Sequence, residues 1–405
     1  MNHKSLFHKT LFVLIALSTM LLTLSAVSLT RATPAAPNAP GDLDPTFAGF
    51  GTGGVVTETG LSNITGVALQ PDGKVVVAGY TGTANALAVY RYLPNGQPDP
   101  TFGSGGKALI PDMFWARAVA LQSDGKIVVG GTKNADFRVA RLTPNGALDT
   151  SFGAEGLVIT DFDGQAIELR AVLVTPGGMI VAGGIALVSG ADFAVARYNA
   201  DGLPDNTFDG DGKVTIDFGA HDRLYDMALQ NDDKLVVVGV HTGGIPADWD
   251  FAVARLNVNG MLDDEFDDDG KLTTGFGGME EARAVVLQPD GKIVVLGKSI
   301  EFKKSHIARY LPNGDLDATF GVNGKRTIPS DILDKLALQP DGKFVALGFH
   351  ESPDGGNIAL HRLLPNSDND TTFGFNGVAW FDFGGTEVGR LLALLPDGRV
   401  LVAGQ

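Results

Sequence analysis

Short apolar runs alternate with turn-forming residues along almost the whole chain. The stretch LQPDGKIVVLG, residues 287–297, is typical, because one apolar run ends at Pro-Asp-Gly and a second run follows at once. An Asp-Gly pair supplies the positive φ angle that a tight hairpin turn needs. Nearly the same residue pattern recurs seven times along the sequence. The pattern therefore predicts a chain built from repeated β-hairpins.

Three sequence motifs recur in the same order along these units. The first is the hairpin turn, which is followed by a glycine five positions after its third residue. The turns begin at Asp72, Asp124, Gly177, Asp232, Asp290, Asp341 and Asp397, and the glycines are Gly79, Gly131, Gly184, Gly239, Gly297, Gly348 and Gly404. The second is an LDxTF-like motif that ends at Phe47, Phe102, Phe152, Phe208, Phe266, Phe320 and Phe373. The third is a strand-like segment that ends at Arg91, Arg141, Arg197, Arg255, Arg309 and Arg362, and its seventh copy is missing.

Each unit offers four strand candidates within about 54 residues. In the second unit they are residues 107–110, 116–121, 126–130 and 137–142. The third candidate is apolar at every position, as in VVVAG and IVVLG, which indicates burial on both faces of a sheet. Four strands in a unit of this length are typical of a propeller blade, whereas solenoid coils are shorter. We predict an all-β propeller of about seven four-stranded blades, the last of them incomplete.

The missing strand leaves three arrangements open. If the Arg segment is outermost, the last blade has three strands and an exposed edge. If the blades are offset from the repeat units, the gap falls inside a blade and the ring fails to close. The third arrangement is a fragment of a longer protein.

The motifs LQPDGKIVVLG, FAVARLNVNG and LDATFG resemble the delta-60 repeat family of bacterial β-propeller proteins. The resemblance covers residues 41–405, with three motifs in a fixed order. It implies the propeller fold and an extracellular or envelope setting, and it brings no catalytic residue with it. The third unit departs from the pattern, with Thr175-Pro176-Gly177-Gly178 at the turn.

The N-terminus has the pattern of a signal peptide, which we assign to residues 1–32. Two lysines precede an uncharged apolar run at residues 11–29, and cleavage after Ala26 or after Ala32 fits the small residues that follow. The alternative is an uncleaved anchor, since 19 residues are long enough to span a bilayer. Residues 33–42 read as a Pro/Ala linker and residues 43–405 as the propeller. We expect a secreted, periplasmic or cell-surface protein without membrane insertion after cleavage.

Composition removes several classes of function. The net charge is −16 and the pI is about 4.7, which argues against a nucleic-acid partner. The sequence contains no cysteine, so disulfides, thiolate catalysis and cysteine-based zinc sites are excluded.

The repeated residues are predicted to be structural. A residue present in every blade is expected to hold the blade together, so we expect each repeated Arg to pair with an acidic or carbonyl group, such as the Asp of LDxTF. The repeated Phe is expected in the core, and the Asp of Asp-Gly-Lys in the turn. Calcium is a weaker possibility at Asp209 and Asp211, at Asp267 to Asp269, and at Asp368 and Asp370, because none of these stretches forms a complete calcium loop.

No catalytic, cofactor-binding or metal-binding residue is assigned from the sequence. His221, His241, His306, His350 and His361 are scattered and form no metal motif. Trp115, Trp249 and Trp380 are weak candidates for sugar contact. The connections at residues 184–192, 240–250 and 349–357 vary most between units and are expected on one side of the ring.

We therefore expect a non-enzymatic scaffold that binds a protein or a glycan through these loops. The alternatives are a propeller-type glycosidase or lyase, with two carboxylates on one site, and a structural fragment of a larger surface protein.

Overall fold

The computed structural model of the chain describes residues 10–15, 40–44, 55–58, 61, 63–81, 86–162, 166–187, 190–243, 248–352 and 355–404. The regular elements of these residues are all β-strands. The described residues form no helix that is long and apolar enough to cross a membrane.

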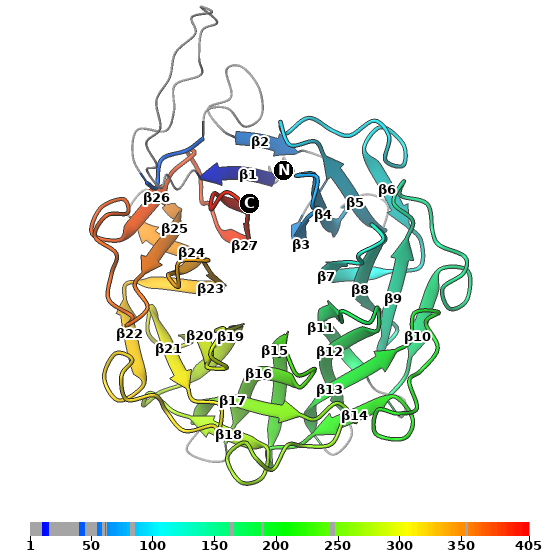
Figure 1. The fold of residues 1–405 in the computed structure, drawn as a ribbon. Coiled ribbons are helices and arrows are strands. Elements are labelled where there is room, and N and C mark those ends of the chain that lie inside the picture. Colours follow the sequence, from blue (N-terminus) through cyan, green and yellow to red (C-terminus); the bar gives the residue numbers. More distant parts are fainter. Residues whose placement is uncertain are drawn as a thin grey trace, which may run out of the picture.

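The strands form seven four-stranded antiparallel sheets, arranged around a central axis as propeller blades (Figure 1). The predicted all-β propeller is confirmed. Six blades each consist of four consecutive strands. From the axis outward these are β3 (Asn63–Leu69), β4 (Val75–Tyr80), β5 (Leu87–Tyr92) and β6 (Lys107–Ile110) in blade 1; β7 (Phe114–Leu121), β8 (Ile127–Lys133), β9 (Asp136–Leu142) and β10 (Leu157–Thr160) in blade 2; β11 (Ala166–Val174), β12 (Ile180–Leu187), β13 (Ala191–Tyr198) and β14 (Lys213–Ile216) in blade 3; β15 (His221–Leu229), β16 (Leu235–Thr242), β17 (Trp249–Leu256) and β18 (Lys271–Thr274) in blade 4; β19 (Glu280–Leu287), β20 (Ile293–Ser299), β21 (Lys304–Tyr310) and β22 (Lys325–Pro329) in blade 5; and β23 (Asp331–Leu338), β24 (Phe344–Ser352), β25 (Gly355–Leu363) and β26 (Val378–Phe381) in blade 6.

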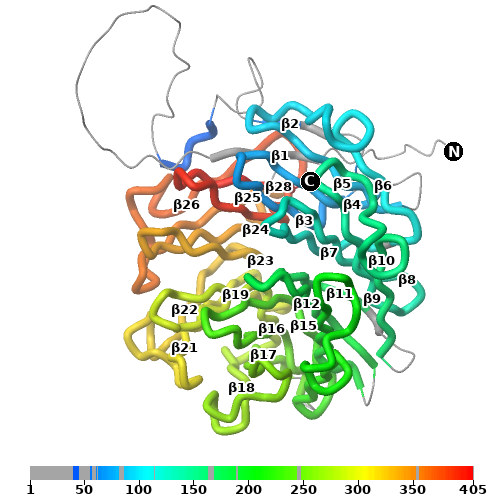
Figure 2. Tube along the Cα trace, turned by 45° about the vertical axis from the view of Figure 1, so that its right-hand side comes forward, coloured from blue at the N-terminus to red at the C-terminus, as the bar shows by residue number. Residues whose placement is uncertain are grey.

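The seventh sheet, blade 7, combines strands from both ends of the chain. Its order from the axis is β27 (Gly389–Leu394), β28 (Val400–Gly404), β1 (Thr10–Ile15) and β2 (Val55–Glu58). The last repeat thus supplies only β27 and β28, and the N-terminal strands β1 and β2 complete the ring. In the turned view, β28 lies between the orange strands of blade 6 and the blue strands of blade 1 (Figure 2).

The blades are offset from the repeat units, which corrects the grouping of strands expected from the sequence. Residues 107–110 form β6, the outermost strand of blade 1, and not the first strand of the next blade. The Arg segment is consequently the third strand of blades 1 to 6, not the outermost. The gap in the last unit falls inside blade 7, where β1 fills it, so the expectation that such a gap prevents closure is wrong. Strand β1 lies within the predicted signal peptide, and residues 33–39 of the predicted linker lie outside the described residues.

The core consists of seven apolar clusters, one between each pair of neighbouring blades. The second strand of each blade contributes most, because it is apolar at successive positions and both its faces meet other blades. Val75, Val76, Val77 and Ala78 of β4 are all buried, as the sequence predicts for this strand.

Candidate functional site

The innermost strand of every blade carries a β-bulge opposite the repeated glycine. In β15, Leu224 pairs with Gly239 and Asp226 pairs with Val238, so Tyr225 is an extra residue without a partner in the ladder. The same register shift occurs in each of the other blades, and in β7 it is wider. A bulge turns one side chain away from the regular alternation of the strand. Seven side chains are therefore redirected at equivalent places around the axis.

These seven side chains, which we term the axial residues, line one cavity of about 270 Å³. They are Thr65, Arg117, Arg170, Tyr225, Arg283, Asp334 and Arg390. Each one precedes the first residue of its hairpin turn by seven positions. The repeated motifs do not reveal these residues, because the position is Arg in four units and Thr, Tyr or Asp in the other three. The signal was present as a variable position inside an otherwise repeated segment.

Arg117 and Arg170 share one carboxylate. One oxygen of Glu168 forms an ion pair with Arg117, and its other oxygen lies 2.5 Å from Arg170 Nη2. The Nε atoms of both arginines are buried without a hydrogen-bond partner among the described residues. Burial lowers the pKa of Arg170, and the neighbouring charges of Arg117 and Arg283 lower it further against the effect of Glu168. Positive charge is therefore concentrated at this side of the cavity.

Arg283 lies between two carboxylates on the opposite side. Its Nη1 is 3.3 Å from Glu281 and its Nε is 3.3 Å from Asp334. Asp334 is also 3.1 Å from Lys298 Nζ. Burial would raise the pKa of Asp334, but the charges of Lys298 and Arg283 outweigh it and lower the pKa. This carboxyl group is accordingly held ionised.

Tyr225 stands between the two arginine groups. Its ring lies 5.0 Å from the Arg170 guanidinium and 4.1 Å from that of Arg283. Its hydroxyl donates a hydrogen bond to Glu281 at 3.0 Å. Cation–π contacts of this kind fix the planes of both guanidinium groups. The cavity wall is thus an ordered arrangement of guanidinium groups around one phenol ring.

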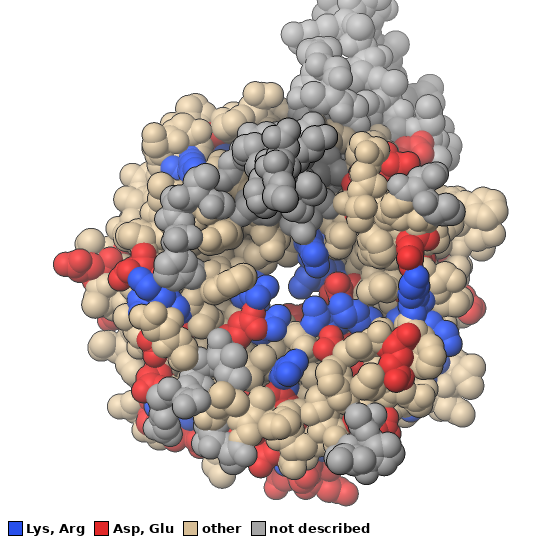
Figure 3. Space-filling view, turned by 180° about the vertical axis from the view of Figure 1, so that it is seen from behind, with Lys and Arg blue, Asp and Glu red and all other residues tan. Residues whose placement is uncertain are grey.

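Two further cations of the cavity have no carboxylate partner. Among the residues that the structure describes, no carboxylate oxygen lies within 4.0 Å of the side-chain nitrogens of Arg390 or Lys335. Arg390 is exposed and Lys335 is half-buried. Viewed from behind, Lys and Arg atoms stand around the central opening of the ring, with some Asp and Glu atoms among them (Figure 3). In a protein of net charge −16, this opening is a local concentration of positive charge.

The repeated arginines lie elsewhere and have the structural role that the sequence predicts. Each Nε contacts the LDxTF aspartate of its own blade, at 2.8 Å for Arg91 and Asp99 and 2.7 Å for Arg197 and Asp205. The guanidinium group also lies over the repeated phenylalanine, 4.6 Å from the ring centroid of Phe208 for Arg197. The described members of the Phe series are buried, whereas Phe47 lies outside the described residues.

Three of the aspartates considered for calcium have local roles. Asp211 and Asp269 accept backbone hydrogen bonds from Lys213 and Lys271 within their turns. Asp370 is the LDxTF aspartate of its unit and pairs with Arg362. Aspartates of the hairpin turns act in the same way, since Asp72 accepts from the backbone N–H of Lys74, which confirms the predicted turn role.

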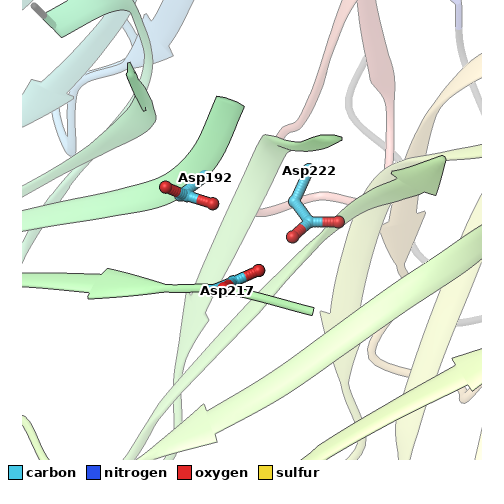
Figure 4. A group of neighbouring side chains, drawn as sticks. All are labelled: Asp192, Asp217 and Asp222. Atoms are coloured by element: carbon cyan, nitrogen blue, oxygen red, sulfur yellow. The ribbon is translucent and has the colours of Figure 1, made fainter. Parts of the chain in front are cut away.

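A different acidic group has the right side chains to share an ion. Oxygens of Asp192, Asp217 and Asp222 all lie within 4.8 Å of one another, and the three carboxylates converge between blades 3 and 4 (Figure 4). Asp222 already accepts hydrogen bonds from the Phe218 N–H at 2.7 Å and from His241 Nδ1 at 2.8 Å. Burial raises the pKa of Asp222. Because both oxygens of Asp222 already accept hydrogen bonds, the three carboxylates leave fewer than the six to eight oxygens that calcium takes, and we assign no metal site here.

The fold brings together two histidines that are scattered in the sequence. His350 Nδ1 and His361 Nε2 each lie 2.6 Å from a different oxygen of Asp331. Burial would raise the pKa of Asp331, but its contacts with His361 and His350 lower it. No motif in the sequence marks this group, because its three members come from three different strands.

The buried side chain of His306 is expected to make the stability of the folded protein sensitive to acid. Burial, with a smaller contribution from Lys304, lowers the pKa of His306 to about 4 from its ordinary 6.5. The unfolded chain therefore takes up the proton first, and stability is lost as the pH falls from about 6.5 through 4. Between pH 7.5 and pH 5, the free energy of unfolding should fall by about 2 kcal/mol more in the wild type than in His306→Gln, as measured by urea unfolding. Equal losses in both proteins would contradict a buried neutral imidazole.

The variable connections join the second and third strands of blades 3, 4 and 6. Equivalent connections emerge on one side of a ring, which agrees with the prediction for residues 184–192, 240–250 and 349–357, although parts of all three lie outside the described residues. Asn63 of the axial cavity pairs with Tyr80 at the end of β4, so the cavity lining reaches this same side. Trp115 is 65% exposed and stacks on Tyr80 there.

Comparison with known proteins supports the repeat architecture. Five segments match the family model described as "Domain of unknown function (DUF5122) beta-propeller", at residues 70–102, 122–152, 176–208, 230–266 and 288–320. The chain thus contains repeats similar to this β-propeller family. No curated protein matches the sequence.

Two solved structures share the fold at low sequence identity. Sqt1 of Chaetomium thermophilum, bound to the N-terminus of ribosomal protein L10, is 13% identical with a TM-score of 0.50, over 86% of this chain and 85% of that chain. Polysaccharide lyase Uly1 is 10% identical with a TM-score of 0.51, over 84% of this chain and 88% of that chain. One is a binding protein and the other an enzyme, so the likeness extends to the fold and leaves the function open.

Proposed function

We propose that this chain is a non-enzymatic binding scaffold, exported from the cytoplasm, that recognises a carboxylate-bearing glycan in its axial cavity. The observation that carries the proposal is the gathering of Arg117, Arg170, Arg283, Arg390 and Lys335 around one cavity of an otherwise acidic protein. Guanidinium groups bind carboxylates in a bidentate manner, and burial strengthens that contact. The delta-60 assignment and the signal peptide are part of the same proposal, because both imply an extracellular setting.

The carboxylates that contact the axial arginines are engaged in a way that supports binding over catalysis. A glycosidase needs one carboxyl group with a raised pKa as general acid and a second as nucleophile or base. Glu168 and Glu281 are engaged by arginines, and the pKa of Asp334 is lowered. These groups act as counter-ions that hold the guanidinium planes in place. Arg390 and Lys335 are the cations best placed to meet a ligand carboxylate.

Binding of oligogalacturonate to the full chain tests this proposal, with neutral cello-oligosaccharides of equal length as the comparison. We expect saturable binding of the acidic sugar only, weakened by salt, because the contact is ionic. Arg390→Gln should raise the Kd about tenfold, since a charge-assisted hydrogen bond contributes about 1.5–3 kcal/mol. Lys213→Gln, which changes a lysine outside the cavity, is the matched control and should leave the Kd unchanged.

Three results would count against this function. Equal binding of neutral and acidic sugars would remove the role of the cations. An unchanged Kd in Arg390→Gln would place the ligand elsewhere on the ring. New reducing ends or unsaturated products after incubation would show cleavage, and the enzyme alternative would then replace the scaffold.

A further inference from the structure

The wide bulge of blade 2 places an aromatic side chain at the surface near the axis. In β7, the innermost strand of this blade, the ladder passes from Phe114 opposite Thr132 to Ala118 opposite Gly130, so residues 115–117 stand against a single residue of β8 (Figure 1). In the other blades each register shift adds only one residue to the inner strand. Trp115 lies in this irregular stretch, and it is 65% exposed.

The backbone of Trp115 is strained. Its φ angle is 47°, in the left-handed region that residues with large side chains rarely adopt. An indole that is mostly in water recovers little of this cost through packing, because it buries little apolar surface. Backbone strain of this kind concentrates at binding and catalytic positions. The conformation of Trp115 is therefore costly, and the packing of its side chain does not account for it.

Two neighbours hold the indole ring of Trp115 in a fixed orientation. The ring of Tyr80, at the end of β4 in blade 1, stacks on it with a centroid separation of 6.3 Å and planes 8° from parallel. The guanidinium carbon of Arg117 lies 5.8 Å from the indole centroid. An aromatic ring that is already oriented loses little conformational entropy when a ligand stacks on it. Trp115 and Tyr80 thus form an exposed aromatic platform between blades 1 and 2.

This aromatic platform adjoins the axial cavity. Trp115 precedes the axial residue Arg117 by two positions, and the residues at the same place in blades 1, 3 and 5 are Asn63, Glu168 and Glu281. Asn63 lines the cavity, and the two glutamates contact its arginines. Blade 2 places an indole where these blades place polar groups. An apolar surface therefore lies directly beside the guanidinium groups of the cavity.

We propose that Trp115 and Tyr80 form a stacking subsite for the sugar unit next to the acidic one. The inference rests on the proposed function, in which the carboxylate of one unit is bound inside the axial cavity. A pyranose ring carries C–H groups on its face, and the adjoining unit lays this face on the indole of Trp115. Arg117 links the two subsites, because it lines the cavity and also contacts the indole ring. The smallest ligand that occupies both subsites is an acidic disaccharide.

Titration calorimetry of the full chain with galacturonic acid and with digalacturonate tests the stacking subsite. We expect the wild type to bind the dimer about tenfold more tightly than the monomer, since the second ring adds an aromatic contact. Trp115→Gly should bind the dimer only as tightly as the monomer, whereas Trp115→Phe should keep most of the difference. Trp380→Ala is the matched control, because it removes an exposed indole from the outermost strand β26, and it should change neither Kd.

If both sugars bind and Trp115→Gly leaves the Kd of the dimer unchanged, the stacking subsite is overturned and the proposed function stands. If neither sugar binds to the wild type, the proposed function fails, and the stacking subsite fails with it.

The Tm of Trp115→Gly separates binding from packing. Glycine adopts a positive φ angle without strain, so the Tm should not fall below that of the wild type. A lower Tm would mean that the indole is needed for packing, and it would count against the subsite. If Trp115→Gly does not fold, Trp115→Asn takes its place in both measurements, because asparagine also adopts the left-handed conformation.

Discussion

Replacing Arg197 by methionine is expected to lower the free energy of unfolding by about 3–5 kcal/mol, the usual cost of removing one partner from a buried ion pair. Arg197 is 6% exposed, and its Nε lies 2.7 Å from Asp205. Its Nη2 donates to Thr207 at 3.1 Å and its Nη1 to the Val258 carbonyl of the next blade at 2.5 Å. One substitution therefore removes contacts within blade 3 and the contact that ties blade 3 to blade 4.

The cost arises mainly from the carboxylate that stays behind. Burial would raise the pKa of Asp205, but Thr207 and Arg197 together lower it. Without Arg197 the charged carboxylate stays in a buried site with fewer donors. The double variant Arg197→Met with Asp205→Leu should therefore be more stable than the sum of the two single changes predicts.

Urea unfolding monitored by circular dichroism measures these differences. Lys213→Met is the matched control, because Lys213 is 3.7 Å from Asp211 with a side chain 30% exposed, and surface pairs contribute about 0–1 kcal/mol. A loss below about 1 kcal/mol for Arg197→Met would mean that the repeated arginines are not what joins the blades.

The arginine pairs were predictable from the sequence because their parts recur together. Arg197 and Asp205 are eight residues apart, and the same separation recurs for Arg309 and Asp317. The strand, the turn and the aspartate of each pair are local to one unit. A motif that is both local and repeated can be interpreted without knowing how the ring closes.

The axial residues were not predictable in the same way. Arg170, Tyr225 and Arg283 come from three different blades, and their contacts exist only because the blades surround one axis. Their positions in the sequence are regular, but only four of the seven share the same side chain, arginine. Blade 7 was also beyond sequence reasoning, because its third strand comes from a segment with the pattern of a signal peptide.

The repeated glycine has a physical reason within its own blade. The structure places it against a carbonyl of the bulged inner strand of its own blade, as for Gly239 and the carbonyl of Arg223. The glycine is thus the sequence mark of the bulge, and the bulge determines which side chain becomes axial.

Gly239→Ala is therefore expected to lower the free energy of unfolding by about 3 kcal/mol, at the upper end of the range for overpacked cores. A Cβ at this position would lie 1.9 Å from the Arg223 carbonyl oxygen and 2.8 Å from Phe193. The carbonyl belongs to the paired inner strand and cannot turn away without breaking its ladder, so the backbone of blade 4 has to shift.

Gly177→Ala is the matched control for this substitution, because it adds the same methyl group where the nearest atom is Thr175 Oγ1 at 3.8 Å. Gly177 has no positive φ angle, so the free energy of unfolding of Gly177→Ala should stay within about 0.5 kcal/mol of wild type. Urea unfolding of both variants separates the clash from the general effect of replacing glycine. If Gly239→Ala is as stable as Gly177→Ala, the bulge can relax, and it then cannot be the device that fixes Tyr225 at the axis.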